Sequence, residues 1–223
     1  MTFRAGIYLA VLSMAAIVIL SNILVHFLLG EWLTYAAFTY PFAFLITDLS
    51  NRLYGSKVAR LIVLIGFFTG ILGSLIGTQI YGEFGPLVTL RVAIASGAAF
   101  LISQLLDIKL FYLFFSKTQW WRAPLFSSII GGSIDTLLFF SVAFDSNFSF
   151  LEPSNDVSWA NTTSPLLGWG PEVPFWLSLS VADFIIKLGI VFVSLVPFRL
   201  ILNKVVYTAV SYTHLTLPTK RIV

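Results

Sequence analysis

The chain has 223 residues, of which 58% are apolar and only 10% are charged, and its mean hydropathy is +0.93. An average soluble domain is about one quarter charged, so this composition excludes a soluble globular protein. Thirteen basic and ten acidic residues give a net charge of +3, which without a basic patch is too small to indicate a nucleic-acid-binding protein, and we expect no nucleic-acid partner. The sequence has no cysteine, which excludes disulfides, iron–sulfur clusters and a cysteine-ligated zinc site, and we expect no cofactor.

Apolar runs that are long enough to cross a bilayer recur along the chain. A transmembrane helix needs about 20 mostly apolar residues. We predict helices, bounded by charges, Pro, Gly or Trp, over residues 6–29, 33–47, 61–80, 87–115, 125–144 and 175–202. The first run exceeds the apolar core of a signal peptide and lacks a clear cleavage site, so we expect a permanent helix. The predicted fold class is all-α: a polytopic integral membrane protein with about six transmembrane helices in one bundle, formed by residues 1–204.

The charged residues of the loops divide by sign between the two sides of this predicted bundle. One side holds the basic residues Arg4, Arg52, Lys57, Arg60, Lys117, Arg122, Arg199 and Lys204. The other side holds the acidic residues Glu31, Glu83, Asp145, Glu152, Asp156 and Glu172. Because basic loops stay in the cytoplasm, we expect both termini to be cytoplasmic and the loop of residues 146–174 to face outward.

Two further segments stand out by composition. Gly66, Gly70, Gly73 and Gly77 form G-x-x-x-G repeats, which favour the close approach of another helix. The tail of residues 205–223 differs from the rest of the chain, and its last part, SYTHLTLPTKRIV, resembles translated vector sequence. We therefore expect this tail to be partly non-native and assign no function to it.

Polar residues recur inside the predicted helices, where an ionised side chain costs roughly 3 kcal/mol on insertion scales. On three helices they are spaced three or four residues apart, which places them on one helix face. These sets are Ser103, Gln104, Asp107 and Phe111; Ser128, Gly131, Gly132, Asp135 and Phe139; and Trp176, Ser180, Asp183 and Lys187. Each of these helices therefore carries a carboxylate on a polar face with an aromatic side chain nearby.

Structural roles compete with functional roles for some of these residues. Asp183 and Lys187 are four residues apart and can neutralise each other as an ion pair within one helix. Asp107 and Asp135 have no cationic residue one turn away on the inferred polar face, which favours a functional role for both.

The predicted helix of residues 33–47 is short and contains Pro41, and the polar residues Asp48 and Asn51 follow it. Broken or short helices with polar ends mark binding sites in transporters. An ordinary proline-kinked helix with a cytoplasmic polar end gives the same pattern.

Three blocks of sequence resemble those of a known family. They are Tyr40–Phe42 with Thr47–Gly55, then Ala99–Asp107, and then Ser133–Thr136 with Phe139–Phe140 and Ala143–Phe144. In this order, over residues 6–204, they resemble the queuosine precursor transporters of the vitamin-uptake type. The resemblance implies a six-helix carrier of the cell inner membrane, not an enzyme, that imports 7-deazaguanine precursors for tRNA modification. The chain departs from the family at Arg52, where many members carry a glutamate, and this difference bears on substrate preference.

A deazaguanine presents adjacent N–H donors beside a carbonyl acceptor, and these groups suit a carboxylate and an amide. Asp107 can accept from the donors while Gln104 donates to the carbonyl. Phe111, Phe139 or Trp176 can stack on the flat ring, and Asp135 is then a second ligand or a proton carrier. The predicted substrate-binding residues are Asp48, Asn51, Gln104, Asp107, Phe111, Asp135, Phe139 and Lys187, and we expect no metal ligand.

Several functions compete for this pattern. The sequence has no G-x-x-x-x-G-K-[ST] loop, so we expect secondary transport of 7-cyano- or 7-aminomethyl-7-deazaguanine, or of queuine, without nucleotide hydrolysis by this chain. The alternative is the substrate-binding membrane subunit of an energy-coupling-factor importer, which needs partner ATPases. An intramembrane aspartyl protease is disfavoured because its G-x-G-D signature is absent. The expected partners are a small deazaguanine-type molecule and the lipid bilayer, and the sequence leaves a homodimer and ATPase partners undecided.

Overall fold

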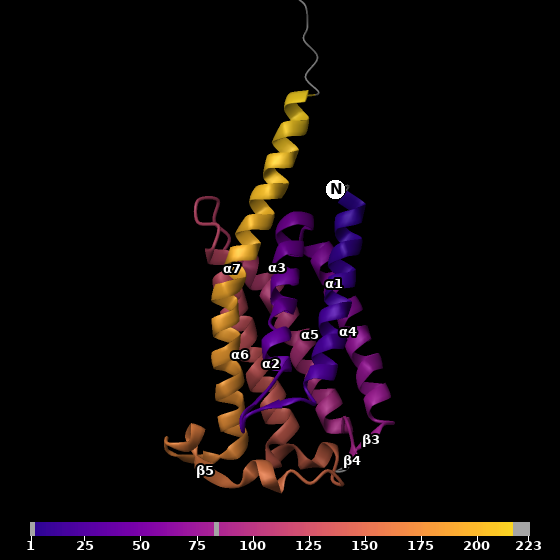
Figure 1. The fold of residues 1–223 in the computed structure, drawn as a ribbon, viewed down its shortest axis with the longest axis vertical. Coiled ribbons are helices and arrows are strands. Elements are labelled where there is room, and N and C mark those ends of the chain that lie inside the picture. The colour runs from indigo at the N-terminus through magenta and orange to yellow at the C-terminus, as the bar shows by residue number, and fades with distance from the viewer. Residues whose placement is uncertain (1–2, 83–84, 216–223) are drawn as a thin grey trace, which may run out of the picture.

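Long helices that lie roughly along one axis build almost the whole molecule (Figure 1). The computed structural model describes residues 3–82 and 85–215. The helices are α1 Phe3–Leu24, α2 Ala36–Thr39, α3 Phe42–Tyr54, α4 Ser56–Gly77, α5 Leu90–Leu113, α6 Arg122–Phe144 and α7 Phe175–Leu215. Among the described residues, five segments are long and apolar enough to cross a membrane, namely α1, α4, α5, α6 and Phe175–Lys204 of α7. The all-α, multi-pass membrane class is therefore confirmed.

Short hairpins and turns connect the helices. Strand β1 (Leu28–Leu29) pairs with β2 (Leu33–Thr34), β3 (Tyr81–Gly82) with β4 (Gly85–Pro86), and β5 (Thr163–Pro165) with β6 (Glu172–Pro174), each antiparallel. The segment between α6 and α7 also contains the 3-10 turns η1 Ser146–Leu151, η2 Ser158–Asn161 and η3 Leu166–Gly168. The loop of residues 146–174 is therefore built from short 3-10 turns and strands, and we call it the folded cover.

The second predicted helix, residues 33–47, is wrong as a single element. Its first residues form strand β2, and the helical part divides at Pro41 into the one-turn helix α2 and the longer helix α3. Proline has no N–H group and its ring collides with the preceding turn, which interrupts a helix at this position. Helix α3 has 13 residues and is about 20 Å long, which is shorter than the hydrocarbon core of about 30 Å. The second pass through the bundle thus consists of α2 followed by α3.

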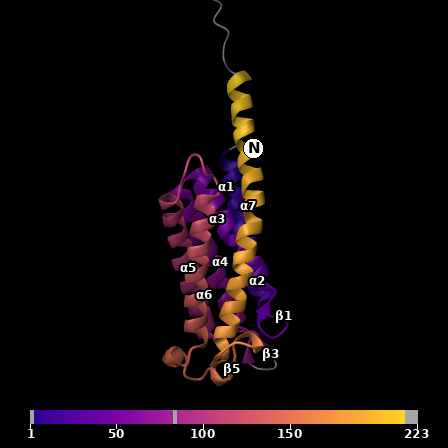
Figure 2. The same cartoon turned by 90° about the vertical axis from the view of Figure 1, so that its left-hand side faces the viewer.

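The two ends of the bundle carry different elements (Figures 1 and 2). The hairpins β3–β4 and β5–β6 lie at one end, which we call the hairpin end, while the N-terminus of α1 lies at the opposite end, where α7 extends past the other helices. Helix α7 continues through residues 205–215 of the predicted tail. Residues 216–223 lie outside the described residues, and a non-native origin of the tail stays a prediction.

The glycine repeat of α4 faces α1. A Cβ atom on Gly66 would lie 2.7 Å from Cγ of Met14, and one on Gly70 would lie 3.3 Å from Cγ1 of Val18. Both partner side chains are buried in the apolar core between these helices. The prediction that small residues let another helix approach closely is confirmed, and that helix is α1.

Candidate functional site

A cavity of about 520 Å³ reaches from the hairpin end into the bundle. Exposed residues of the β1–β2 hairpin, among them Leu28 and Glu31, line its outer part, and the buried Asp135 and Lys187 line its inner part. Its walls are mainly apolar, and the aromatic lining residues are Trp32, Tyr40, Phe139, Phe140, Phe144, Trp159 and Phe175. Small-molecule sites commonly have volumes of roughly 300–1,000 Å³ and apolar walls with a few placed polar groups.

An acidic–lysine triad, Asp135, Asp183 and Lys187, lies at the inner end of this cavity. The ammonium of Lys187 is 2.8 Å from Oδ2 of Asp135 on α6 and 2.6 Å from Oδ2 of Asp183 on its own helix. Thr136 accepts a hydrogen bond from Lys187 and donates one to Asp183, each 2.8 Å long. The side chain of Asp183 is 15% exposed, compared with 4% for Asp135, so Asp183 is the carboxylate more open to the cavity.

The break in the second pass contacts this triad directly. Tyr40, which precedes Pro41, donates a hydrogen bond of 3.2 Å to Oδ1 of Asp135, and Ser103 on α5 donates one of 3.1 Å to the same oxygen. The ring of Tyr40 also lies 5.6 Å from the ammonium of Lys187, in cation–π geometry. Side chains of α2–α3, α5, α6 and α7 therefore meet at one carboxylate, and a movement of the broken segment changes its surroundings.

The cation beside Asp135 adds to what the sequence indicates. We expected Asp183 and Lys187 to pair within one helix, and that ion pair is confirmed. The sequence shows no cationic residue one turn from Asp135 on its own helix, and the structure adds one from a neighbouring helix, because Lys187 of α7 reaches Asp135. Residue spacing within a single helix contains no information on such a contact.

Polar groups of α3, α5 and α6 form a second buried cluster nearer the opposite end of the bundle. Asp48 accepts hydrogen bonds from Ser127 (3.3 Å) and Ser128 (3.0 Å). Asp107 lies beside Asp48 and Ser127, the two side chains that interact with its carboxyl group. We call Asp48 and Asp107 the buried carboxyl pair; both are less than 3% exposed.

Amide side chains extend this second cluster along α3 and α5. Oε1 of Gln104 accepts a hydrogen bond of 2.5 Å from Thr47, and Nδ2 of Asn51 donates one of 3.1 Å to the carbonyl of Ile108. Nε2 of Gln104 and Oδ1 of Asn51 are buried and have no partner among the described residues. Unsatisfied polar atoms inside a protein are costly, so each of them requires a physical explanation.

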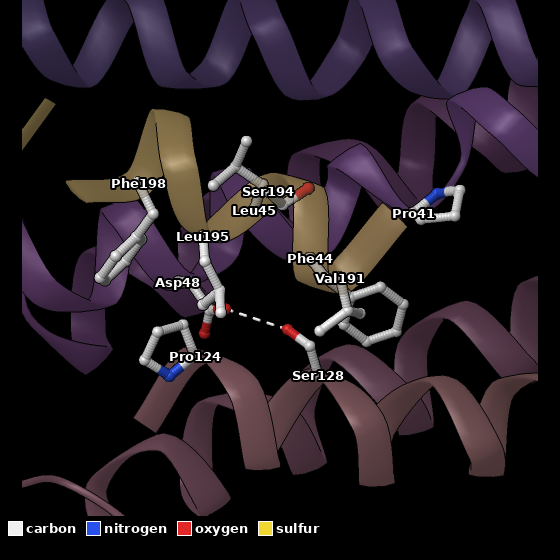
Figure 3. A pocket seen from close by; sticks show the side chains of 10 residues that line it. All are labelled: Pro41, Phe44, Leu45, Asp48, Pro124, Ser128, Val191, Ser194, Leu195 and Phe198. Atoms are coloured by element: carbon white, nitrogen blue, oxygen red, sulfur yellow. Dashed lines mark hydrogen bonds between the residues drawn. The ribbon is translucent and has the colours of Figure 1, made fainter. Parts of the chain in front are cut away.

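A pocket of about 10 Å³ borders the buried carboxyl pair (Figure 3). Asp48 and Ser128 line it, joined by the hydrogen bond drawn there, together with Ser194 of α7. The hydroxyl of Ser194 is buried and has no partner in the described part of the chain. This volume holds about one water molecule at most.

The structure divides the predicted site residues between three places. Asp135, Phe139 and Lys187 line the cavity. Asp48, Asn51, Gln104 and Asp107 belong to the second cluster and do not line the cavity. Phe111 packs in an apolar cluster with Phe198, and Trp176 packs beside Phe140 outside the cavity lining. That all of these residues bind substrate stays a prediction.

Several cavity residues with polar side chains were absent from the predicted set, among them Asp183, Tyr40 and Asn22. Asp183 and Tyr40 were left out because the first was assigned to its local ion pair and the second to a family block. Asn22 of α1 lines the cavity with a buried Nδ2 atom that has no partner in the described residues. The available signal was the pair Ser21 and Asn22, polar residues that interrupt the apolar run of the first helix.

Arg91 fixes the hairpin end of α5 to the neighbouring chain. Its side chain is fully buried and donates hydrogen bonds to the carbonyls of Val142 (2.7 Å) and Asp145, while its backbone N–H donates to Glu152 (2.9 Å). The carbonyl groups at the end of α6 thereby gain charged partners. This arrangement anchors the folded cover beside the cavity.

The chain matches a family model described as "Putative vitamin uptake transporter" over residues 34–202. A Haemophilus influenzae protein named "Probable queuosine precursor transporter" is 30% identical over 181 residues, which cover 76% of this chain and 68% of that protein. An Escherichia coli K12 protein named "Queuosine precursor transporter" is 35% identical over 137 residues, which cover 56% of this chain and 62% of that protein. No solved structure matches the chain.

The family match includes the broken second pass and the helices α5, α6 and α7 that carry the triad and the buried carboxyl pair. It confirms the resemblance that the sequence blocks indicated. The chain is a multi-pass membrane protein with a cavity inside its helical bundle. It belongs to the vitamin uptake transporter family.

Proposed function

We propose that this protein is a secondary transporter that imports queuosine precursors of the 7-deazaguanine class across the cell inner membrane. The observation that carries the proposal is the cavity with the acidic–lysine triad at its inner end. The names of the two relatives support the choice of substrate class. The proposed cargo is 7-cyano- or 7-aminomethyl-7-deazaguanine, or queuine.

The chemistry of the cavity suits a flat base with donors on one edge. In this proposal, Asp183 accepts the N–H groups of the guanidine-like edge, because it is the triad carboxylate more exposed to the cavity. Asn22 supplies the free amide donor for the carbonyl of the base. Phe139 and Phe140 offer faces for stacking on the ring.

The distribution of charge supports an outward-facing cavity. The described loops at the hairpin end carry Glu31, Glu152, Asp156 and Glu172, and the one basic residue described there, Arg91, is buried. Basic residues such as Lys57, at the start of α4, and Lys117, in the loop between α5 and α6, belong to the opposite end, which the positive-inside rule assigns to the cytoplasm. In this orientation the cavity opens to the outside and both termini are cytoplasmic.

Equilibrium binding of radiolabelled 7-cyano-7-deazaguanine to the purified full chain tests the binding site. Asp183→Asn should weaken binding about tenfold or more, because a charge-assisted hydrogen bond contributes roughly 1.5–3 kcal/mol. Asn22→Ala should have a smaller effect, since it removes one neutral donor. Asp156→Asn is a matched control, because Asp156 is an exposed carboxylate of the loop.

The sequence-based hypothesis makes the opposite prediction for the same assay. If Gln104 and Asp107 read the edge of the base, Asp107→Asn abolishes binding and Asp183→Asn leaves it intact. That result would move the substrate site from the cavity to the second cluster.

Transport by the purified chain alone separates secondary transport from the energy-coupling-factor alternative. A secondary transporter moves labelled precursor into liposomes with no other protein present. Uptake that appears only after ATPase subunits and ATP are added would assign the chain to the alternative class.

A further inference from the structure

The buried carboxyl pair, Asp48 and Asp107, has no positive partner in the described structure. The described ion pairs of buried residues involve only Lys187 with Asp135 and Asp183. The hydrogen-bond donors to Asp48 are the neutral hydroxyls of Ser127 and Ser128. Asp107 is fully buried, and the groups that interact with its carboxyl group are Asp48 and Ser127, neither of which is a cation.

The charged side chains of the surrounding helices contact other groups or are exposed. On α3, the guanidinium of Arg52 lies over the ring of Phe115 at 4.5 Å from the centroid. On α5, Lys109 is exposed. On α7, Lys187 is held by the triad. On α6, the described charged residue that faces inward is Asp135, which is itself paired with Lys187.

The other charged groups of the same helices lie at their ends or in the triad. On α7, the guanidinium of Arg199 lies over the ring of Trp120 at 5.0 Å from the centroid. Asp183 of α7 and Tyr40, which precedes α3, belong to the cavity side of the bundle. On α1 and α4, the basic residues Arg4, Lys57 and Arg60 are exposed. The described ion pairs and cation–π contacts therefore place no cation against the buried carboxyl pair.

Two adjacent carboxyl groups in a water-poor interior cannot both be ionised, because their charges repel and neither is solvated. Either a proton or a bound cation must compensate one of them. The pocket beside Asp48 has a volume of about 10 Å³, which leaves no room for a hydrated metal ion. The surroundings therefore favour a proton.

A second observation indicates that this location exchanges a small ligand. The amide nitrogen of Gln104 is a buried donor without a partner, and so is the hydroxyl of Ser194, which lines the same pocket as Asp48. A permanently closed core would pair such groups. Free donors beside a carboxyl pair can hold a water molecule that carries a proton to or from it.

Helix α5 links this pair to the triad. Ser103 donates to Asp135 in the triad, while the next residue, Gln104, accepts from Thr47, which precedes Asp48 in α3. Asp107 follows Ser103 by four residues, which is about 6 Å along the helix axis. A change in the position of α5 or α3 therefore alters both polar clusters together.

We propose that Asp48 and Asp107 share one exchangeable proton and that this pair is the coupling site of the transporter, distinct from the substrate cavity. The inference rests on the proposed transport function. The proton binds when the pair is open to the outside and leaves toward the cytoplasm when the bundle changes conformation. Substrate movement is thereby tied to a pH gradient.

Infrared spectroscopy of the full chain in liposomes tests the protonation without any substrate. The wild-type protein should show the C=O band of a protonated, buried carboxyl group at neutral pH. The band should be absent from Asp48→Asn/Asp107→Asn and present in Asp156→Asn, which changes an exposed loop carboxylate. A wild-type spectrum without the band, or a band that persists in the double variant, would overturn the proposal.

Transport in the same liposomes tests the coupling. For one proton per substrate, an outside pH about one unit lower than the inside should drive about tenfold accumulation of labelled 7-cyano-7-deazaguanine. In the double variant, accumulation of the label should no longer respond to the pH gradient. Accumulation that follows a sodium gradient and ignores the pH gradient would overturn the proton site.

Failure of the proposed function gives a different result. If the wild-type chain binds no deazaguanine, the substrate assignment is refuted, and the infrared band with its loss in the double variant still decides whether the pair holds a proton.

Discussion

Replacement of Lys187 by methionine removes the one cation of the acidic–lysine triad and leaves two carboxylates facing each other inside the bundle. The side chains of Lys187, Asp135 and Asp183 are 6%, 4% and 15% exposed, so water screens them little. Breaking a buried ion pair by removal of one partner costs roughly 3–5 kcal/mol. We expect a destabilisation of this size for Lys187→Met.

Removal of one carboxylate should be much milder. In Asp183→Asn the ammonium of Lys187 keeps Asp135 at 2.8 Å, and the amide oxygen can still accept its hydrogen bond. The expected cost is about 1 kcal/mol, the net contribution of an ordinary hydrogen bond. The double variant Lys187→Met/Asp183→Asn should be more stable than Lys187→Met alone, because it removes one of the two uncompensated charges.

A double-mutant cycle on thermal unfolding of the purified protein in detergent measures these effects. The expected order of stability is wild type, Asp183→Asn, the double variant, and then Lys187→Met. If the losses of the two single variants simply add in the double variant, the residues do not interact and the triad does not act as one unit.

Three other predictions concern the frame around the cavity. Gly66→Leu should destabilise the protein by about 1–3 kcal/mol, since the added side chain collides with Met14 of α1, and thermal unfolding measures the loss. Arg91→Met should cost roughly 3 kcal/mol and make the loop of residues 146–174 more sensitive to proteolysis, because buried carbonyls lose their charged donor. A cysteine introduced at Asn155 should react with an impermeant reagent from outside the cell, and one introduced at Lys57 should not; the reverse labelling would refute the orientation.

Hydropathy was sufficient to predict the long passes of this fold. Helices α1, α4, α5, α6 and α7 each begin within about five residues of the predicted positions, because apolar length is what a bilayer demands. The second pass was harder to predict. Pro41 indicated a break, but the residues before it also read as apolar helix, and their pairing as strand β2 depends on a partner strand.

The sequence predicted which polar residues lie inside the bundle, but it did not predict which of them contact one another. Spacing on α5 places Ser103, Gln104 and Asp107 on one side, yet the structure directs the first to Asp135 and the third to Asp48. One face of a helix spans a wide arc. The packing of the neighbouring helices therefore determines which partner each polar side chain contacts. The contact of Lys187 with Asp135 depends on how α6 and α7 pack, which no local pattern contains.

Uptake of labelled 7-cyano-7-deazaguanine by cells that cannot synthesise deazaguanines tests the central claim most directly. Cells that express the wild-type chain should accumulate the label and restore the modified tRNA nucleoside, and cells that express Asp183→Asn should do so about tenfold less at equal membrane abundance. Asp156→Asn should match the wild type. Absence of uptake by the wild-type chain at normal abundance, or undiminished uptake by Asp183→Asn, would contradict a deazaguanine site in this cavity.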